Sequence, residues 1–239
     1  MKKLFFILSL GFLLLVAPMA TAQVQHSDTT YSVSLHAGYA HNLTYGSYGN
    51  FDIAAYLPIN TYFEAEAQVR LSTANFYTFG VQVRPKFALP IGELYIEDRL
   101  LANLLKRDAY LDFTHAISLG YRMQYVDVQV GMFSRVMMPQ SYEARTGEEM
   151  VCEPFNLLYS VTAFVQPATS PWNISLAIAN IDDYQMERMW QPMFYLGGWY
   201  DINEHWRVSL NGKLKLAGMF HLNAHYYAAE LRVGAEYKF

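Results

Sequence analysis

Residues 61–72 read TYFEAEAQVRLS, and this stretch decides the fold. One set of alternate positions is apolar and comprises Phe63, Ala65, Ala67, Val69 and Leu71. The other set is polar and comprises Glu64, Glu66, Gln68, Arg70 and Ser72. Such a two-residue period belongs to a β-strand with two different faces, because a helix repeats about every 3.6 residues. Residues 76–89 repeat the pattern, so the sequence predicts an all-β protein.

The same period predicts twelve strands along the chain. They cover residues 31–41, 49–57, 62–72, 77–88, 94–104, 110–123, 126–136, 155–166, 173–180, 190–200, 206–216 and 226–239. Ten strands also fit, because 173–180 is short and 190–200 contains Pro192. Short turns such as 90–93 alternate with links that are mostly longer. Strands of about ten residues with this alternation are typical of a closed antiparallel transmembrane β-barrel.

The first 22 residues predict a secretory signal peptide. Lys2 and Lys3 precede an apolar run, and the small residues at 20–22 form a cleavage site. We therefore expect a signal peptide at 1–22, an N-terminal periplasmic segment at 23–30 and the barrel at 31–239. After residue 22 no run of eighteen apolar residues occurs, so no transmembrane helix is predicted. The single cysteine, Cys152, allows no internal disulfide.

Composition predicts a surface that faces lipid. Charged residues make up 16% of the chain, against about 25% in an average soluble domain. The apolar face also contains many alanines, which fill a sandwich core poorly but suit a lipid-facing wall. Removing Lys2 and Lys3 changes the formal net charge from −4 to about −6, so no basic surface for nucleic acid is expected.

Aromatic residues gather toward the strand ends, as in the two girdles of membrane barrels. One group lies toward the short turns and comprises Tyr31, Tyr62, Tyr95, Tyr125, Trp172, Trp206, Tyr237 and Phe239. The other group lies toward the longer links and comprises Tyr45, Tyr77, Tyr110, Trp190 and Tyr226.

The chain ends on the strand YYAAELRVGAEYKF, residues 226–239, and its last residue is aromatic. The outward set of this strand comprises Leu231, Val233, Ala235, Tyr237 and Phe239. This ending resembles the terminal strand of outer-membrane β-barrel proteins of Gram-negative bacteria. The resemblance implies an outer-membrane location with both termini periplasmic, contact with outer-membrane lipid and lipopolysaccharide, and recognition of the last strand by the barrel assembly machinery. It implies no particular activity.

The inward positions carry charges of both signs. They comprise Glu64, Glu66, Arg70, Arg84, Lys86, Glu97, Arg99, Asp112, Arg122, Asp127, Arg135, Arg207, Lys213, Lys215, Glu230, Arg232, Glu236 and Lys238. Charges inside a narrow barrel need partners, because an unpaired buried charge costs several kcal/mol. The sequence thus predicts a lumen that is crossed by salt bridges and is closed or narrowly open.

Two hairpins predict specific charge pairs. A turn centred on Asn75 would place Glu64 opposite Lys86 and Glu66 opposite Arg84. A turn centred between His221 and Leu222 would place Arg207 opposite Glu236 and Lys213 opposite Glu230. Facing opposite charges stabilise a sheet by a few tenths to about 1 kcal/mol each.

Two groups of residues raise the question of hydrolysis. Ser34 and His36 face inward with Asp52 nearby, which is the composition of a nucleophile system. A site inside the lumen gives a lipid no entry, so a polar lining is the favoured reading. Outer-membrane phospholipases are also twelve-stranded and carry His-x-Ser on the lipid-facing wall. The nearest match fails, because His115 faces outward and Ser118 faces inward.

The sequence therefore favours a non-enzymatic barrel, either structural and docking or a narrow conduit for small solutes. The alternative is a lipid-modifying hydrolase. No cofactor is indicated, and no metal site can be assembled from the residues. The longest link, 137–154, would be extracellular in the expected orientation and is a candidate surface for a partner.

Overall fold

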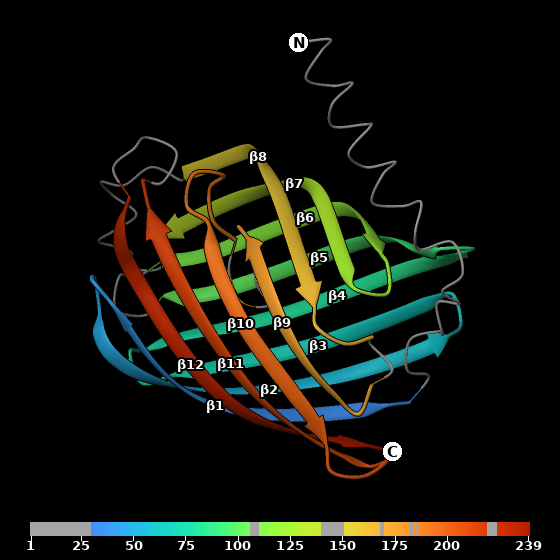
Figure 1. The fold of residues 1–239 in the computed structure, drawn as a ribbon. Coiled ribbons are helices and arrows are strands. Elements are labelled where there is room, and N and C mark those ends of the chain that lie inside the picture. Colours follow the sequence, from blue (N-terminus) through green and yellow to red (C-terminus); the bar gives the residue numbers. More distant parts are fainter. Residues whose placement is uncertain are drawn as a thin grey trace.

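The computed structural model describes residues 30–105, 110–139, 151–167, 170–181, 184, 186–218 and 224–239. Twelve strands are present: β1 (Ser32–Asn42), β2 (Gly46–Asn60), β3 (Phe63–Ser72), β4 (Phe76–Leu89), β5 (Gly92–Leu105), β6 (Tyr110–Arg122), β7 (Val126–Pro139), β8 (Val151–Phe164), β9 (Trp172–Ala179), β10 (Met193–Asp201), β11 (Trp206–Ala217) and β12 (His225–Lys238). Neighbours in sequence pair antiparallel, and β1 pairs with β12 to close the barrel (Figure 1). The predicted closed twelve-stranded barrel is confirmed, and the ten-stranded count is wrong.

The part of the chain expected to be the signal peptide, 1–22, lies outside the described residues, as do residues 23–29. Within the described ranges, no helix is long and apolar enough to cross a membrane.

Along each strand, alternate side chains point into the barrel and out of it; the two sets are called the two parities of the strand. On β4, Phe79 and Val81 are half exposed on the outer wall, whereas Lys86 is buried inside. On β3, Glu64 is 4% exposed and also points into the interior. This separation follows from closure, because every strand then has a neighbour on both sides and each side chain is either inside or outside.

The connections define two ends of the barrel. The turn end holds residues 61–62, 90–91, 123–125, 165–171 and 202–205, and the loop end holds all the other connections. The chain enters β1 and leaves β12 at the turn end, where the Phe239 amide donates to the Tyr31 carbonyl at 2.9 Å. The two longest connections, between β7 and β8 and between β9 and β10, therefore join their strands at the opposite rim.

The β3–β4 hairpin corrects one predicted register. Glu64 lies opposite Arg84, and Glu66 lies opposite Gln82, so each pair is shifted by two residues. The turn contains residues 73–75, and Asn75 adopts a positive φ of 62°. A three-residue hairpin loop commonly ends on a left-handed residue, and asparagine tolerates that conformation. The hairpin is thus centred one residue earlier than expected.

Several predicted boundaries also move. β7 extends to Pro139 and β8 begins at Val151, so the predicted link 137–154 shortens to residues 140–150, which lie outside the described part. β10 begins at Met193 instead of residue 190, because Pro192 cannot donate a ladder hydrogen bond. Tyr95, expected in the aromatic girdle, is 3% exposed and lies inside on the same parity as its charged neighbours.

The closing seam pairs the whole of β1 with residues 228–238 of β12, from Ser32 opposite Lys238 to Asn42 opposite Ala228. The outward positions Leu231 and Val233 of β12 are more than half exposed. At the turn end the Tyr237 and Phe239 rings meet edge to face, with centroids 5.0 Å apart.

We predict that deletion of Phe239 reduces insertion of the barrel into the outer membrane, because it removes the terminal aromatic ring on which recognition of the last strand is expected to depend. The measurement is the fraction of heat-modifiable protein in isolated outer membranes. Phe155→Ala removes another exposed ring, on the outer wall, and serves as the control. Equal insertion of the deletion variant and the control would refute this role of Phe239.

Candidate functional site

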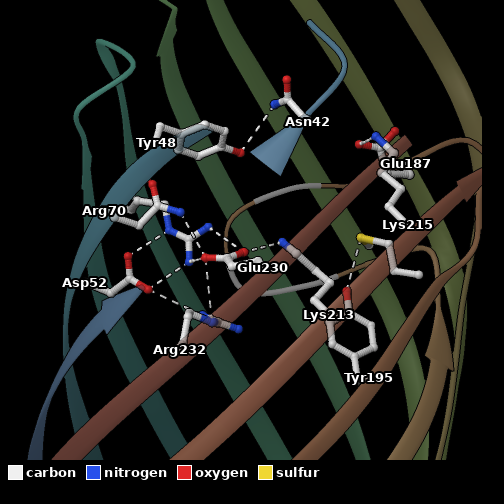
Figure 2. Close-up of polar contacts among 12 residues, drawn as sticks. Asn42, Tyr48, Asp52, Arg70, Glu187, Tyr195, Lys213, Lys215, Glu230 and Arg232 are labelled. Carbon is white, nitrogen blue, oxygen red and sulfur yellow. Dashed lines mark hydrogen bonds and ion pairs between the residues drawn. The ribbon is translucent and has the colours of Figure 1, made fainter. Parts of the chain in front are cut away.

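The candidate site is the charged interior, and its main part is an ion network that we call the central cluster. It comprises Asp52, Arg70, Lys213, Glu230 and Arg232 (Figure 2). Arg70 Nε donates to Asp52 Oδ1 at 2.7 Å, and Arg70 Nη2 lies 2.9 Å from Glu230 Oε1. Lys213 Nζ lies 2.8 Å from Glu230 Oε2, and Arg232 Nη1 lies 3.4 Å from Asp52 Oδ2. Asp52 therefore meets two cations, and Glu230 meets three, because Arg232 Nε also lies 3.9 Å from Glu230 Oε1.

Strand pairing brings the central cluster together. Asp52 on β2 lies opposite Arg70 on β3, and Lys213 on β11 lies opposite Glu230 on β12. The pair between Arg70 and Glu230 joins these two halves across β1 and β2, which separate β3 from β12. Arg70 and Glu230 come within reach of each other only because a closed barrel curves inward. The cluster thus links β2 and β3 to β11 and β12.

A second network, the lateral cluster, lies on β2 to β5 and comprises Tyr56, Glu64, Arg84, Lys86, Glu97 and Arg99. Glu64 accepts from Arg84 at 2.6 Å and from Lys86 at 2.7 Å. Arg84 also reaches Glu97 at 2.5 Å. One arginine therefore bridges two carboxylates on different strands, which makes the lateral cluster a continuous chain of alternating charges.

Further pairs extend around the interior. Asp127 accepts from Tyr95 Oη at 2.7 Å and from Arg122 Nε at 2.7 Å. On neighbouring strands, Arg135 donates to Asp112. These pairs connect β5, β6 and β7 and explain why Tyr95 lies inside.

The predicted lumen charges are distributed as follows. The β11–β12 register places Arg207 opposite Glu236 and Lys213 opposite Glu230, as the hairpin predicted. Arg207 Nη1 is 3.7 Å from Glu236 Oε2, but its Nε is closer, at 2.6 Å, to Asp201. The predicted Glu66–Arg84 pairing is wrong: Glu66 accepts from Gln82 at 2.8 Å.

Lys86 keeps Glu64 as a partner although the register differs from the predicted one. It lies two residues beyond Arg84, which is directly opposite Glu64, and its long side chain reaches back diagonally.

A connection at the loop end folds into the barrel. This inner loop, residues 180–192, is described at 180–181, 184 and 186–192. Asn180 is fully buried and donates from Nδ2 to the Leu157 carbonyl at 2.7 Å and to the Glu187 carbonyl at 2.8 Å. Lys215 donates to Glu187. The buried Asn180 side chain therefore joins the start of the inner loop to Glu187 and to β8.

The inner loop has an apolar seat that the alternation pattern does not predict. Ile181 and Met186 pack in one buried cluster with Leu101, Ala116, Phe133, Leu158 and Ala179. Leu101, Phe133 and Leu158 occupy inward positions of β5, β7 and β8, where polar residues were expected. Large apolar residues on the polar parity were the sequence signal for an inserted segment.

Tyr184, on the inner loop, connects it to the central cluster. Its ring is 5% exposed, and the Arg70 guanidinium carbon lies 4.0 Å from the ring centroid. Arg232 approaches the same ring at 5.8 Å. A guanidinium over an aromatic face is attractive, more so where water is excluded. The inner loop is therefore fixed to β3 through Arg70 and to β12 through Arg232.

A cavity of about 300 Å³ lies in the interior and reaches from the inner loop toward the turn end. Ile181 and Tyr184 bound it on one side, and Arg232 and Glu66 supply its charges. Most of the other polar lining is uncharged and comprises Ser34, His36, Gln68, Ser160, Thr162, Ser175 and Asn211. This volume is at the lower end of the usual range for ligand pockets, about 300 to 1,000 Å³.

The structure places the predicted nucleophile candidates in this cavity and its wall. Ser34 and His36 line the cavity, and His36 lies opposite Asp52. Asp52 accepts hydrogen bonds from Arg70 and Arg232, and His36 Nε2 is 3.3 Å from Ser209 Oγ. These contacts are those of a polar lining, and a catalytic role for Ser34 stays a prediction.

Ser118 and His115 lie on opposite faces of β6, as expected. Ser118 is buried and accepts from Gln129 Nε2 at 2.6 Å, whereas His115 lies on the outer wall. Among the described residues, no group of three His, Cys, Asp or Glu side chains could hold a metal ion.

No protein-family model matches the sequence, and no curated relative matches it either. Solved structures do match. The translocator domain of autotransporter NalP from Neisseria meningitidis is 13% identical, with a TM-score of 0.58 over 90% of this chain and 91% of that one. A KdgM porin in complex with disordered oligogalacturonate is 8% identical, with a TM-score of 0.56 over 87% and 99%. The NanC porin is 9% identical, with a TM-score of 0.53 over 87% and 100%.

At these identities the likeness concerns the fold. The chain has the fold of outer-membrane β-barrel proteins, and the class-level resemblance of the sequence is confirmed.

We predict that Glu230→Gln destabilises the barrel by about 3–5 kcal/mol, because it leaves buried cations without their carboxylate. The measurement is urea unfolding of the protein in lipid vesicles, followed by tryptophan fluorescence. Glu204→Gln makes the same chemical change in an exposed turn and leaves the unfolding midpoint unchanged. Equal midpoints for both variants would contradict the structural role of the central cluster.

Proposed function

We propose that this chain is an integral outer-membrane barrel that acts as a narrow conduit for small polar solutes. The observation that carries the proposal is the polar cavity in the barrel interior, bounded by Tyr184 of the inner loop. The similar folds of proteins described as porins support a conduit. The half-exposed apolar residues of the outer wall, such as Phe79 and Leu231, support contact with outer-membrane lipid and lipopolysaccharide.

The cavity lining favours solutes that carry no net charge. Its wall has one carboxylate, on Glu66, and one guanidinium, on Arg232, while its other polar side chains offer hydroxyl, amide and imidazole groups. Hydroxyl and amide groups replace the hydrogen bonds that a polar solute loses when it leaves water. Many of the other interior charges are held in ion pairs, such as Lys213 with Glu230. Hydroxyl-rich or zwitterionic molecules fit this lining best.

The inner loop limits the size of the solute. Tyr184 lies between the cavity and the central cluster, where it contacts both the cavity space and Arg70. Asn180 ties the loop to β8, because it donates to the Leu157 carbonyl and accepts from the Tyr159 amide, so the ring is held in place by the barrel wall. Tyr184 is therefore the constricting side chain of the proposed conduit.

We predict that Tyr184→Ala raises the single-channel conductance in planar bilayers several-fold, because it removes the constricting ring. The same variant should speed the swelling of proteoliposomes in small uncharged sugars more than in charged solutes of equal size. Tyr200→Ala is the matched control, since Tyr200 is 56% exposed on the outer wall.

Two outcomes would overturn the conduit. One is an absence of conductance and swelling in both the natural protein and the Tyr184→Ala variant, which would leave a structural or docking barrel. The other is an equal effect of the two tyrosine substitutions.

The proposal includes an orientation, with both termini in the periplasm and the loop end at the cell surface. The single cysteine tests it, because Cys152 is exposed at the loop end of β8. We predict that a membrane-impermeant maleimide labels Cys152 on intact cells. In a Cys152→Ser background, Asn203→Cys at the turn end should react only after the envelope is permeabilised. The reverse pattern would show the opposite orientation.

A further inference from the structure

Three polar side chains form an island on the apolar outer wall. They are Asp98 on β5, His115 on β6 and Ser134 on β7. His115 lies directly opposite Ser134, and His115 Nε2 is 2.8 Å from Asp98 Oδ1. The Asp98 and His115 side chains are 48% and 44% exposed, so both are accessible from outside the barrel. Three neighbouring strands thus present aspartate, histidine and serine side by side.

These three polar residues are an exception on an outer wall that is otherwise apolar around them. The outward neighbours along the same strands are Ile96 and Leu100, Phe113 and Ile117, and Met132 and Val136. A carboxylate and an imidazole on a lipid-facing wall cost free energy, and ionisable groups in such places usually mark a functional site. The ion networks inside the barrel do not explain Asp98 and His115, because these two side chains point outward.

The wall is hollowed on both sides of the island. A hollow of about 670 Å³ lies over β2 to β7 and includes His115 and Ser134 in its lining. A second hollow of about 460 Å³ lies over β5 to β8 and also includes His115 and Ser134. The lining of both is otherwise mostly apolar. Two apolar hollows that meet at a polar centre suit the acyl chains of a lipid on either side of its ester.

A register irregularity lies beside Ser134. Between β7 and β8 the pairing shifts from Phe133 opposite Asn156 to Arg135 opposite Glu153. Ser134 therefore faces two residues, Pro154 and Phe155, on the other strand. Such bulges recur next to active sites, where they redirect a side chain.

The depth of the island matches that of an ester linkage. A membrane strand needs about 9–11 residues, whereas β5, β6 and β7 have 14, 13 and 14. If that surplus of roughly three residues extends beyond the membrane at the loop end, His115 and Ser134 lie about two residues inside the apolar band, because each is five residues from that end of its strand. Lipid esters occupy this boundary between headgroup and acyl chain.

We propose that Ser134, His115 and Asp98 form an acyl-ester hydrolase site on the outer wall, with membrane lipid esters as its substrate class. The proposal is independent of the conduit, because the site lies on the opposite face of the sheet. Ser134 is the nucleophile, His115 is the general base, and Asp98 is a positioning residue that holds the imidazole ring.

The reaction balances with water as the second reactant. When Nε2–H of His115 donates to Asp98, Nδ1 carries the lone pair and takes the Ser134 hydroxyl proton. The serine oxygen attacks the ester carbonyl carbon, the ester C–O bond breaks, and the leaving alcohol receives the proton from the imidazolium. Water then gives a proton to His115 as its oxygen attacks the acyl-serine carbonyl carbon. The bond between that carbon and the Ser134 oxygen breaks, His115 passes the proton to the Ser134 oxygen, and a fatty acid is released.

The test uses the purified full-length protein in detergent micelles, with a long-chain alkyl fluorophosphonate as probe and a fluorogenic long-chain ester as substrate. We expect the probe to label Ser134, as mapped by mass spectrometry. Ser134→Ala should abolish labelling, and His115→Asn should slow both reactions about a hundredfold or more. Ser47→Ala, which changes an exposed, outward serine of β2 away from both hollows, is the matched control and should react like the natural protein.

Asp98→Asn separates positioning from folding. It should lower kcat with little change in KM and should alter the pH dependence of the rate, whereas a purely structural role would leave the pH profile unchanged. Heat-modifiable gel mobility verifies that each variant is a folded barrel. Folded natural protein that is not labelled at Ser134, or labelling that is equally fast in His115→Asn, would overturn the proposal and leave the conduit proposal untouched.

Discussion

Closure of the sheet between β1 and β12 is the constraint on which the rest of the structure depends. It supplies hydrogen-bonding neighbours to both edge strands, and it divides every strand into inward and outward positions. Charges on the inward positions are then enclosed and require partners. The central cluster meets this requirement across the seam, because Arg70 on β3 reaches Glu230 on β12. The ion network thus ties the two ends of the chain together inside, as the backbone ladder does along the wall.

Alternation along single strands was sufficient to predict the fold, because parity depends only on local sequence. The pairing register between strands was harder to predict from the sequence. The β11–β12 pairing followed from the hairpin, whereas the β3–β4 pairing was displaced by the left-handed conformation of Asn75. Contacts between strands that are not neighbours, such as Arg70 with Glu230, depend on barrel curvature and stagger, which no single strand encodes. Asp52 does lie opposite His36, as expected, but its carboxylate binds Arg70 and Arg232, which the sequence did not predict.

The exceptions to alternation carry most of the functional information. Leu101, Phe133 and Leu158 are apolar residues on the polar parity, and they form the seat of the inner loop that brings Tyr184 into the barrel. Asp98 is the reverse case, a charged residue on the apolar parity. Both kinds of exception cost stability unless a specific partner or ligand compensates them. Each could have been read from the sequence by asking which positions violate the period.

Interior contacts on β5, β6 and β7 support the site on the outer wall of the same strands. On β5, Asp98 lies between Glu97 and Arg99, which point inward and are ion-paired with each other, and Glu97 also binds Arg84 of β4. On the other side, Ser118 of β6 and Gln129 of β7 are hydrogen-bonded inside the barrel. Side chains that project from one face of a strand inherit the rigidity that contacts on the other face impose. The interior ion pairs therefore hold the outer wall in register at the place where three strands must align their polar side chains.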